Sequence, residues 1–433
     1  MFKTRTDRRD RWTKTRGAQS AGMETTSAFE GLSCVDCETT FDAETTTHRC
    51  PDCDGILDPT YDYDRIDLTP ADLDRREGDS MWRYAELLPF PRSAAVSIGE
   101  GATPLVECPS LADAMGVGRV LLKDEGANPT GTFKDRGQSL ATTAAREHGA
   151  SDVALNSAGN AGQAAAAYAA RAELDAHVYL PSRAGFTQKA MTEVHGAELT
   201  VTDPMDGSSQ IGDAGAAYAA AMEENPDWYS TKTFVTPYRH EGKKTMALEL
   251  LESLDWEAPD AVVYPTGGGV GLVGMHKAAR EARELGWSDE LVPMYAAQAA
   301  GCAPVVEAYE SGADRHEPVA NDAIDTACNG IAIPDPGASH LILEAIRESD
   351  GGAVATTDHA ILDAAIEVAR TEGLEVGATC AAAVSGAFAL AESGEFGPDD
   401  TVVLLNTGAG NKDVDSLRAH LGERAATAND GSV

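Results

Sequence analysis

A chain of 433 residues is too long for one hydrophobic core, because single cores stop growing at about 250 to 300 residues. Its 70 Asp and Glu against 34 Lys and Arg give a formal net charge of −36, and such a surface repels the phosphates of DNA and RNA. No apolar run approaches the roughly 18 residues that span a bilayer. We therefore expect a soluble protein with neither nucleic acid nor membrane as a partner. The charge is spread along the whole chain, which favours a surface adapted to high salt over an acidic interaction tail.

The first 22 residues carry seven Lys or Arg, two Asp and almost no apolar side chains. This composition predicts a disordered basic tail over residues 1–22, since nothing in it could be buried to offset the entropy of ordering. An arm that binds nucleic acid or membrane is the alternative, and Met23 offers a second start of the chain. No apolar run follows the basic stretch, so it does not resemble an export signal, and we expect a cytoplasmic protein.

Half of the eight cysteines form two CxxC pairs, Cys34 with Cys37 and Cys50 with Cys53. Two thiolate pairs at this spacing supply the ligands of a tetrahedral structural Zn²⁺ site. A rubredoxin-like iron site would use the same ligands, and two disulfides are an alternative that a reducing cytoplasm disfavours. We expect a zinc ribbon over residues 23–60, folded largely by its metal because it is too small to bury a core. His48 is expected to face solvent beside the second pair.

After a Pro- and Asp-rich connector, residues 61–95, short apolar runs alternate with helical stretches. The runs have the length and composition of strands buried on both faces, and the stretches between them have helical spacing and few breakers. This alternation predicts parallel α/β sheets covered by helices in a domain of residues 96–433. Strands are expected at residues 120–123, 153–156, 177–180, 198–201, 261–264, 294–298 and 402–406, and helices at 161–174, 188–197, 243–254, 270–285 and 361–373.

Three loops at strand ends combine glycines with polar residues. The first reads NPTGTFKDRG and places Lys134 where a helix begins, and the second reads NSAGNAG and contains Ser157 and Asn160. The third, TGGGVG, follows the strand of residues 261–264, and its glycines let backbone N–H groups close on a phosphate at a helix N-terminus. Neither a Walker lysine nor Rossmann spacing accompanies it, which disfavours a nucleotide. Such loops line the ligand crevice of an open α/β sheet, where a neutral lysine could attack an aldehyde; an exposed helix lysine is the alternative for Lys134.

These segments occur in the order found in threonine synthase and its fold-type II relatives, which use pyridoxal phosphate (PLP). With EGATPL from Glu100 and NTGAGNKD from Asn406, they make residues 96–415 resemble that family. The resemblance implies two open parallel-sheet α/β subdomains, the smaller at about residues 131–239, an N-terminal zinc ribbon and a homodimer. It also implies a small amino-acid substrate; in the family, O-phosphohomoserine and water give L-threonine and phosphate.

The resemblance further assigns roles to residues. Lys134 would form the Schiff base with PLP and then move protons as general acid and base. Asn160 would hydrogen-bond the 3′-oxygen. Thr407 would place a neutral hydroxyl at the pyridine nitrogen, which leaves the ring unprotonated and favours elimination and replacement over transamination. The 5′-phosphate would be held by the third loop, which consists of Gly267, Gly268, Gly269, Val270 and Gly271.

Three features bear on the substrate. The family usually has Ser-Thr-Gly-Asn-Thr around its asparagine, whereas this chain reads Ser-Ala-Gly-Asn-Ala from Ser157, so two hydroxyls that help to hold a substrate phosphate are missing. Arg239 matches an arginine that the family places near that phosphate, and a surface salt bridge is its alternative role. Cys380 lies where the family has a Glu-Pro-Ala-Ser type of sequence, and it is expected to be a small buried residue.

Three hypotheses follow. The ribbon and the NPTGTFKDRG segment favour threonine synthase. The missing hydroxyls favour a threonine or serine dehydratase, or a β-replacement enzyme that uses an amino acid such as phosphoserine. A zinc-ribbon binding protein with an inert enzyme-like domain is the third, and the presence of Lys134 and of the glycine loop counts against it.

Overall fold

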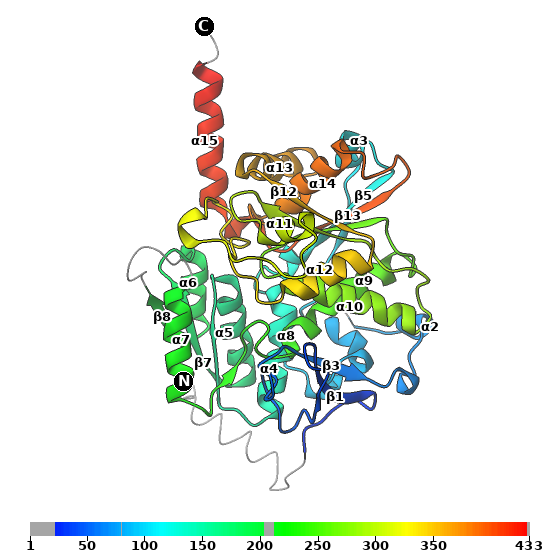
Figure 1. Cartoon of the computed structure of the whole chain (residues 1–433), viewed down its shortest axis with the longest axis vertical. Helices are drawn as coiled ribbons and strands as arrows, with labels where there is room; N and C mark the ends of the chain where they lie inside the picture. Colours follow the sequence, from blue (N-terminus) through cyan, green and yellow to red (C-terminus); the bar gives the residue numbers. More distant parts are fainter. Residues whose placement is uncertain (1–21, 79, 203–211, 431–433) are drawn as a thin grey trace. The chain divides into compact units, whose positions relative to one another are not determined.

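The computed structural model describes residues 22–78, 80–202 and 212–430. The basic tail expected over residues 1–22 therefore lies outside the described residues, apart from Gly22. The chain divides into two compact units (Figure 1). Unit 1 consists of the described part of Met1–Leu68 with Arg76–Glu100 and Lys134–Gly242. Unit 2 consists of Thr69–Arg75, Gly101–Phe133 and the described part of Lys243–Val433.

Unit 1 begins with a small antiparallel sheet in the strand order β2-β1-β3. Leu32 and Leu57 pack with Cys34 and Cys50 in a small cluster of buried residues. The cluster is much smaller than the core of an independent domain, so the sheet depends on further interactions for its stability. The bounds are β1 Phe29–Cys34, β2 Thr40–Phe41 and β3 Leu57–Tyr61, followed by the 3₁₀ helices η1 Tyr63–Arg65, η2 Met81–Leu87 and η3 Arg92–Ala94.

The second sheet of unit 1 has four parallel strands in the order β8-β7-β6-β9. Val178 of β7 packs with Ala165 of α5, while the ring of the next residue, Tyr179, meets the ring of Tyr218 on α7. Because successive side chains point to opposite faces of a strand, α5 and α7 cover the two faces of the sheet. The bounds are β6 Asp152–Asn156, β7 Asp175–Pro181, β8 Glu198–Thr202, β9 Tyr229–Ser230, α4 Lys134–Glu147, α5 Asn160–Ala172, α6 Phe186–Val194, α7 Gly212–Glu224 and α8 Tyr238–Glu241.

Unit 2 is built on a six-stranded sheet in the order β12-β11-β10-β13-β5-β4, in which only the β4 and β5 pair is antiparallel. Val263 of β10 belongs to the same buried cluster as the alanines of α14, whereas Tyr264 reaches α10 on the opposite face. The strands are β4 Leu105–Glu107, β5 Arg119–Asp124, β10 Ala261–Pro265, β11 Met294–Ala299, β12 Gly352–Thr356 and β13 Thr401–Asn406.

Helices cover both faces of this sheet, as the burial of its central strands requires. The α-helices are α2 Pro70–Asp74, α3 Pro109–Met115, α9 Thr245–Ser253, α10 Val270–Glu284, α11 Pro304–Glu310, α12 Ser339–Glu348, α13 Asp358–Thr371, α14 Ala382–Glu392 and α15 Val414–Asp430. The 3₁₀ helices are η4 Glu125–Ala127, η5 Gly242–Lys244, η6 Asn321–Ala323 and η7 Gly410–Lys412.

The predicted fold class, parallel α/β sheets covered by helices, is confirmed, and all seven predicted strands are present. One detail of the prediction was wrong. Residues 198–201 were expected to be buried on both faces, but β8 lies at the edge of its sheet, and Glu198, Thr200 and Val201 are exposed. An edge strand has a neighbour on one side only, so its apolar content does not require burial.

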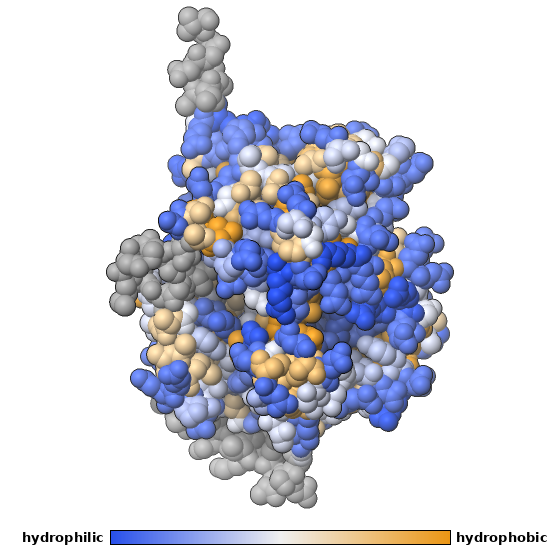
Figure 2. Space-filling model, in the orientation of Figure 1, coloured by the Kyte–Doolittle hydropathy of each residue, from blue (hydrophilic) through white to orange (hydrophobic). Residues whose placement is uncertain are grey.

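Hydrophilic side chains predominate on the face of the molecule shown in Figure 2. Among the large apolar side chains of the described residues, Phe186 and Val194, both on α6, are the most exposed. Within the described part of the chain, no helix has the length and the apolar content that crossing a bilayer would take.

Candidate functional site

Three loops of unit 2 start at the same edge of its sheet. Strand β13 lies between β10 and β5 and runs parallel to both. Thr407 directly follows β13, the glycine loop of residues 267–271 follows β10, and residues 125–133 follow β5 and lead directly into Lys134. The carboxyl ends of parallel strands are the usual ligand-binding edge of an open α/β sheet. The fold therefore gathers three of the predicted site segments at the edge where a ligand is expected.

The glycine loop fits a phosphate group. Gly269 is the N-cap of α10 with a φ of +67°, and a Cβ built on it would lie 2.2 Å from Cδ1 of Ile342. A Cβ on Gly267 would lie 2.9 Å from Cγ1 of Ile333. At Gly268, in contrast, a Cβ would meet no described atom within 4 Å, so the bare backbone faces open space there. No side chain of the described residues caps α10, and the N–H groups and dipole at a helix start attract an anion.

Tyr264, the residue before the end of β10, was missed as a candidate. Its hydroxyl would lie 1.9 Å from a Cβ on Gly271, so position 271 must be glycine for the tyrosine to fit. The side chain is buried, its hydroxyl has no hydrogen-bond partner within the described residues, and burial raises its pKa well above 10. A buried hydroxyl without a partner costs free energy, so it is expected to meet a polar group that is bound at the loop. The sequence feature that could have identified it is a single tyrosine in a strand whose other residues are aliphatic.

Thr407 has a specific partner. Its hydroxyl lies 3.1 Å from Sγ of Cys380, and the thiol also lies 3.6 Å from the carbonyl oxygen of Gly408. Burial, followed by the charge of Asp413, raises the pKa of Cys380 to about 12, so the thiol keeps its proton at neutral pH. Gly408 forms an isolated antiparallel bridge with Thr132. Cys380 is buried as expected, but it is also bonded to the hydroxyl of Thr407.

The backbone that precedes Lys134 is held at the same edge. The N–H of Phe133 donates to the carbonyl oxygen of Thr407 at 3.0 Å. The carbonyl oxygen of Phe133 accepts a hydrogen bond from Nζ of Lys243, and this nitrogen lies 4.3 Å from the centre of the Phe133 ring. Lys134 is the next residue, half-buried, and it starts α4. The predicted position of this lysine at a loop-to-helix junction agrees with the structure.

Two other buried lysines have structural partners. Lys123 lies 2.8 Å from Oε2 of Glu249 and also donates to a backbone carbonyl, and Lys244 lies 2.9 Å from Oε2 of Glu281. Removing one member of a buried ion pair leaves an uncompensated charge. These lysines are therefore bound to carboxylates for structural reasons.

In unit 1, Ser157 and Asn160 flank the turn between β6 and α5. The hydroxyl of Ser157 accepts a hydrogen bond from the N–H of Gly159 at 3.0 Å, and Gly159 has a φ of +143°, a value that favours glycine. The carbonyl oxygen of Asn160 accepts from the amide of Gln188 at 3.2 Å. Gln188, which the sequence did not suggest, thereby orients the Asn160 amide so that its NH₂ group is directed away from this contact.

Arg239, in α8, is completely buried. Its Nη1 donates to the carbonyl oxygen of Thr231 at 2.7 Å, but Nε and Nη2 have no partner within the described residues. Burial lowers its pKa to about 10, which still leaves the guanidinium charged at neutral pH. A surface salt bridge was the alternative role for this residue, and the burial excludes it. A buried cation with two unused donor nitrogens calls for an anion.

Comparison with known proteins identifies the family to which the chain belongs. The family described as "Pyridoxal-phosphate dependent enzyme" matches residues 96–408. A threonine synthase of Methanosarcina acetivorans is 37% identical over 379 residues, which cover 87% of this chain and 91% of that protein. The chain belongs to the threonine synthase family of PLP-dependent enzymes. Another member, from Methanocaldococcus jannaschii, is 34% identical and covers 88% of this chain and 93% of that protein.

Solved structures agree with the family fold. Maize serine racemase matches with a TM-score of 0.61 at 20% identity, over 75% of this chain and 93% of that one. A fungal L-serine ammonia-lyase from Rhizomucor miehei matches with a TM-score of 0.60 at 21% identity, and the match covers 76% of this chain and 99% of that one. At this identity the likeness concerns the fold alone. The predicted resemblance to threonine synthase and to fold-type II PLP enzymes is confirmed.

This threonine synthase family member also brings its four paired cysteines together. Sγ of Cys34 lies 3.5 Å from Sγ of Cys53, Sγ of Cys37 lies 3.7 Å from Sγ of Cys50, and all four sulfurs lie within 4.8 Å of one another. A tetrahedral zinc ion with bonds of about 2.3 Å separates its sulfur ligands by roughly 3.8 Å, whereas a disulfide is about 2.05 Å long. The donor set therefore fits a tetrahedral metal ion and not two disulfides.

The expectation for His48 was wrong. The ring is half-buried, its Nε2 lies 3.0 Å from the N–H of Ser230, and it packs against the ring of Tyr229 with the centroids 4.9 Å apart. A histidine beside a CxxC pair was assigned to solvent because the four sulfurs complete the ligand set. The structure uses it instead to attach the ribbon to β9.

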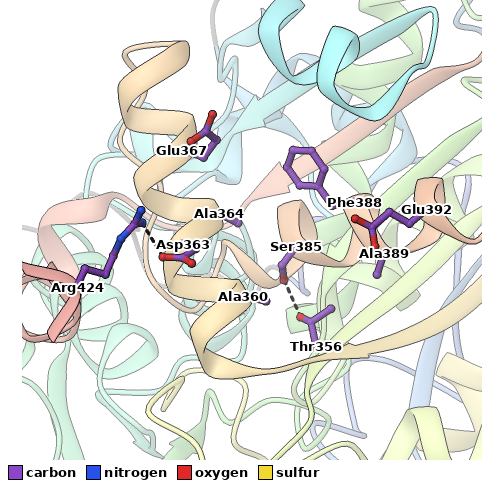
Figure 3. A pocket seen from close by; sticks show the side chains of 10 residues that line it. All are labelled: Thr356, Ala360, Asp363, Ala364, Glu367, Ser385, Phe388, Ala389, Glu392 and Arg424. Carbon is purple, nitrogen blue, oxygen red and sulfur yellow. Dashed lines mark hydrogen bonds and ion pairs between the residues drawn. The ribbon is translucent and has the colours of Figure 1, made fainter. Parts of the chain in front are cut away.

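A hollow of about 380 Å³ lies among α13, α14 and α15 of unit 2 (Figure 3). At its rim Asp363 accepts hydrogen bonds from His420 at 2.8 Å and from Arg424 at 2.6 Å, and its other oxygen lies 3.1 Å from Nδ1 of His359. Arg424 neutralises the carboxylate, so we interpret the cluster as an attachment of α15 and not as a cation site. None of the predicted site residues lines the hollow, which is formed by Thr356, Ala360, Asp363, Ala364, Glu367, Ser385, Phe388, Ala389, Glu392 and Arg424.

Proposed function

We propose that the protein is a lyase that converts O-phosphohomoserine and water to L-threonine and phosphate. The observation that carries the substrate assignment is Arg239, a fully buried guanidinium with two nitrogens that have no partner within the described residues. A charged donor of this geometry binds a phosphate through two parallel hydrogen bonds. Arg239 compensates in this proposal for the hydroxyls that Ala158 and Ala161 lack.

Lys134, Asn160, Thr407 and the glycine loop of residues 267–271 are proposed to hold PLP. When bound, PLP supplies an electron sink that stabilises negative charge at the substrate carbon beside the amino group. Asn160 supports this role because Gln188 fixes its amide, and the loop supports it because its backbone is bare at Gly268. Tyr264 adds a buried hydroxyl that is suited to a phosphate oxygen.

Thr407 is proposed to donate a hydrogen bond from its hydroxyl to the pyridine nitrogen and to keep its proton. The protonated Cys380 thiol lies 3.1 Å away, and if the S–H bond points to the Thr407 oxygen, the O–H bond of Thr407 is free to point elsewhere. A neutral hydroxyl leaves the ring nitrogen without a proton, which limits electron withdrawal and favours elimination and replacement over transamination.

Lys134 is proposed to be the residue that would hold PLP covalently and, as a free amine, would move protons at the substrate. The hydrogen bonds at the Phe133 N–H and carbonyl fix the backbone next to it. A general acid or base acts only within hydrogen-bond reach of its proton, so a fixed backbone is an advantage.

Three further parts of the proposal concern the whole protein. The paired cysteines bind one structural Zn²⁺, which their sulfur separations support. The surface is adapted to high salt, which the net charge of −36 supports. Family membership supports a homodimer in the cytoplasm, and light scattering of the purified protein would measure the mass in solution.

The decisive experiment is turnover with a panel of substrates, namely O-phosphohomoserine, threonine, serine and phosphoserine. We expect release of inorganic phosphate and formation of threonine from O-phosphohomoserine, with serine and threonine turned over far more slowly. Formation of a keto acid and ammonia from serine or threonine, with no reaction of O-phosphohomoserine, would establish a dehydratase instead.

A further inference from the structure

The N-terminal ribbon, residues 23–60 with the end of β3 at Tyr61, contacts the short helix that carries Arg239. The hydroxyl of Tyr61 donates to Oε1 of Glu241 at 2.6 Å. Nε2 of His240 lies 2.9 Å from Oδ1 of Asp58. Asp58 and Tyr61 both belong to β3, and their partners are the two residues that directly follow Arg239 in the chain. The ribbon thus binds α8 next to the arginine.

The ribbon also contacts the segment that accepts the hydrogen bond of Arg239. Nη1 of Arg239 donates to the carbonyl oxygen of Thr231. The preceding residue, Ser230, donates its N–H to Nε2 of His48 at 3.0 Å. An acceptor at Nε2 requires the proton on Nδ1, which lies 3.1 Å from the hydroxyl of Thr47. His48 is therefore oriented within the ribbon and in turn orients β9.

These contacts determine the position of α8, since a helix of four residues has no stability of its own. Within the described part of the chain no side chain caps it, so its geometry depends on what packs around it. Glu241 and His240 are buried, and a buried carboxylate is costly unless hydrogen bonds satisfy it. Tyr61 supplies such a bond, and its loss would weaken the attachment of the Glu241 carboxylate, and with it of α8, to the ribbon.

We propose that the ribbon is a positioning element for Arg239 and thereby sets the affinity of the enzyme for the anionic group of its substrate. Tyr61 and Asp58 hold the helix that carries the guanidinium, and His48 holds the strand that directly precedes its acceptor, Thr231. The inference rests on the proposed function in one respect, namely that Arg239 binds the substrate phosphate. The ribbon then acts on substrate binding and leaves the attachment of PLP unchanged.

Tyr61→Phe tests this with the loss of one hydroxyl. Its matched control is Thr60→Val on the same strand, because among the described residues the Thr60 hydroxyl bonds to Gly31 alone, within the ribbon. We expect Tyr61→Phe to raise KM for O-phosphohomoserine and to weaken binding of inorganic phosphate by about tenfold, a loss typical of a hydrogen bond to a charged acceptor. The value of kcat, the zinc content and the absorbance of bound PLP should stay near those of the parent enzyme. Thr60→Val should leave KM and phosphate binding within about twofold.

A double-mutant cycle separates positioning from general destabilisation. If Tyr61 acts through Arg239, Tyr61→Phe should have little further effect on phosphate binding in an Arg239→Lys background, because the guanidinium is already gone. Full additivity of the two changes, or a Tyr61→Phe enzyme that matches Thr60→Val, would overturn the proposal. Asp58→Ala, which removes the acceptor of His240, provides a second variant with the same expected phenotype should Tyr61→Phe fold poorly.

The phosphate titration, followed by calorimetry, also separates this inference from the proposed function. A parent protein that does not turn over O-phosphohomoserine, but binds phosphate in a way that depends on both Arg239 and Tyr61, would refute the substrate and retain the positioning role. A parent protein that forms threonine, with phosphate binding unaffected by Tyr61→Phe and Asp58→Ala, would retain the function and refute the positioning role.

Discussion

The thiol of Cys380 lies 3.1 Å from the hydroxyl of Thr407, and both side chains are buried. Because its pKa is raised to about 12, chiefly by burial, the thiol remains a donor at neutral pH. It has two acceptors in reach, the Thr407 hydroxyl and the carbonyl oxygen of Gly408. The orientation of the Thr407 O–H bond therefore depends on a residue 27 positions away in the chain.

Cys380→Ala should lower kcat by roughly threefold to tenfold, the effect of losing one hydrogen bond of about 0.5–1.5 kcal/mol. Cys380→Ser keeps a donor at the same position and should retain most of the activity. Both variants should bind PLP, so the absorbance of the cofactor serves as the control for folding. Equal loss of activity in the two variants would mean that the volume of the thiol matters and its hydrogen bond does not.

Lys134→Ala should abolish the covalent bond to PLP and lower turnover by at least about a thousandfold, because nucleophile and proton carrier are removed together. The melting temperature should change little, since Lys134 is half-buried at the start of a helix. Borohydride reduction followed by peptide mapping measures the attachment directly. Label on Lys123, Lys189 or Lys243 would contradict the assignment.

Much of the fold was predictable because its signals are local. Buried parallel strands are continuous apolar runs, and the loops that follow them carry glycines at positions such as Gly269, where φ is positive. Lys134 and Thr407 were found through motifs whose order along the chain matches the threonine synthase family. The edge strand β8 was misjudged because its neighbours in the sheet cannot be read from its own residues.

The supporting residues of the site were not predictable in this way. Cys380 looked like a small buried residue, and His48 looked like a bystander of the metal ligands. Tyr61 and Glu241 are separated by 180 positions in the chain, so no local pattern connects them. These residues act through pairs that only the fold brings together, whereas motifs identify residues that would touch a ligand themselves.

Removal of the metal should unfold the ribbon. The buried cluster around Leu32 and Leu57 is small, so binding of an ion by four thiolates supplies much of the folding free energy there. Cys34→Ser should abolish stoichiometric zinc and make the ribbon sensitive to proteolysis, while Cys302→Ala, at a cysteine outside the pairs, should keep full zinc content. Metal analysis of purified protein settles the prediction, and a preparation with neither zinc nor iron would contradict it.

Salt should stabilise the protein. The excess acidic side chains, which give a net charge of −36, repel one another over about 10 Å at 0.1 M ionic strength but only over about 3 Å at 1 M. We expect the melting temperature to rise by at least about 5 °C between these conditions, or roughly 1.5–2 kcal/mol for units of this size. Potassium chloride and sodium chloride should act alike if screening is the cause. A melting temperature that does not depend on salt would show that the charges are already compensated.

Stability should also fall with pH below neutrality, in part through His148. Its ring stacks on Tyr229, its Nε2 has no partner within the described residues, and burial lowers its pKa below the usual 6.5. The pKa of His148 is lower in the folded protein than in the unfolded chain, so the unfolded chain binds the proton first as pH falls. The stabilisation that is present above pH 6.5 is therefore lost as pH falls toward the pKa of the folded protein. His148→Phe keeps the ring contact and removes the titration. Urea unfolding at pH 7.5 and 5.5 should therefore show a smaller loss of free energy in this variant than in the parent, and equal losses would mean that other groups cause the whole dependence.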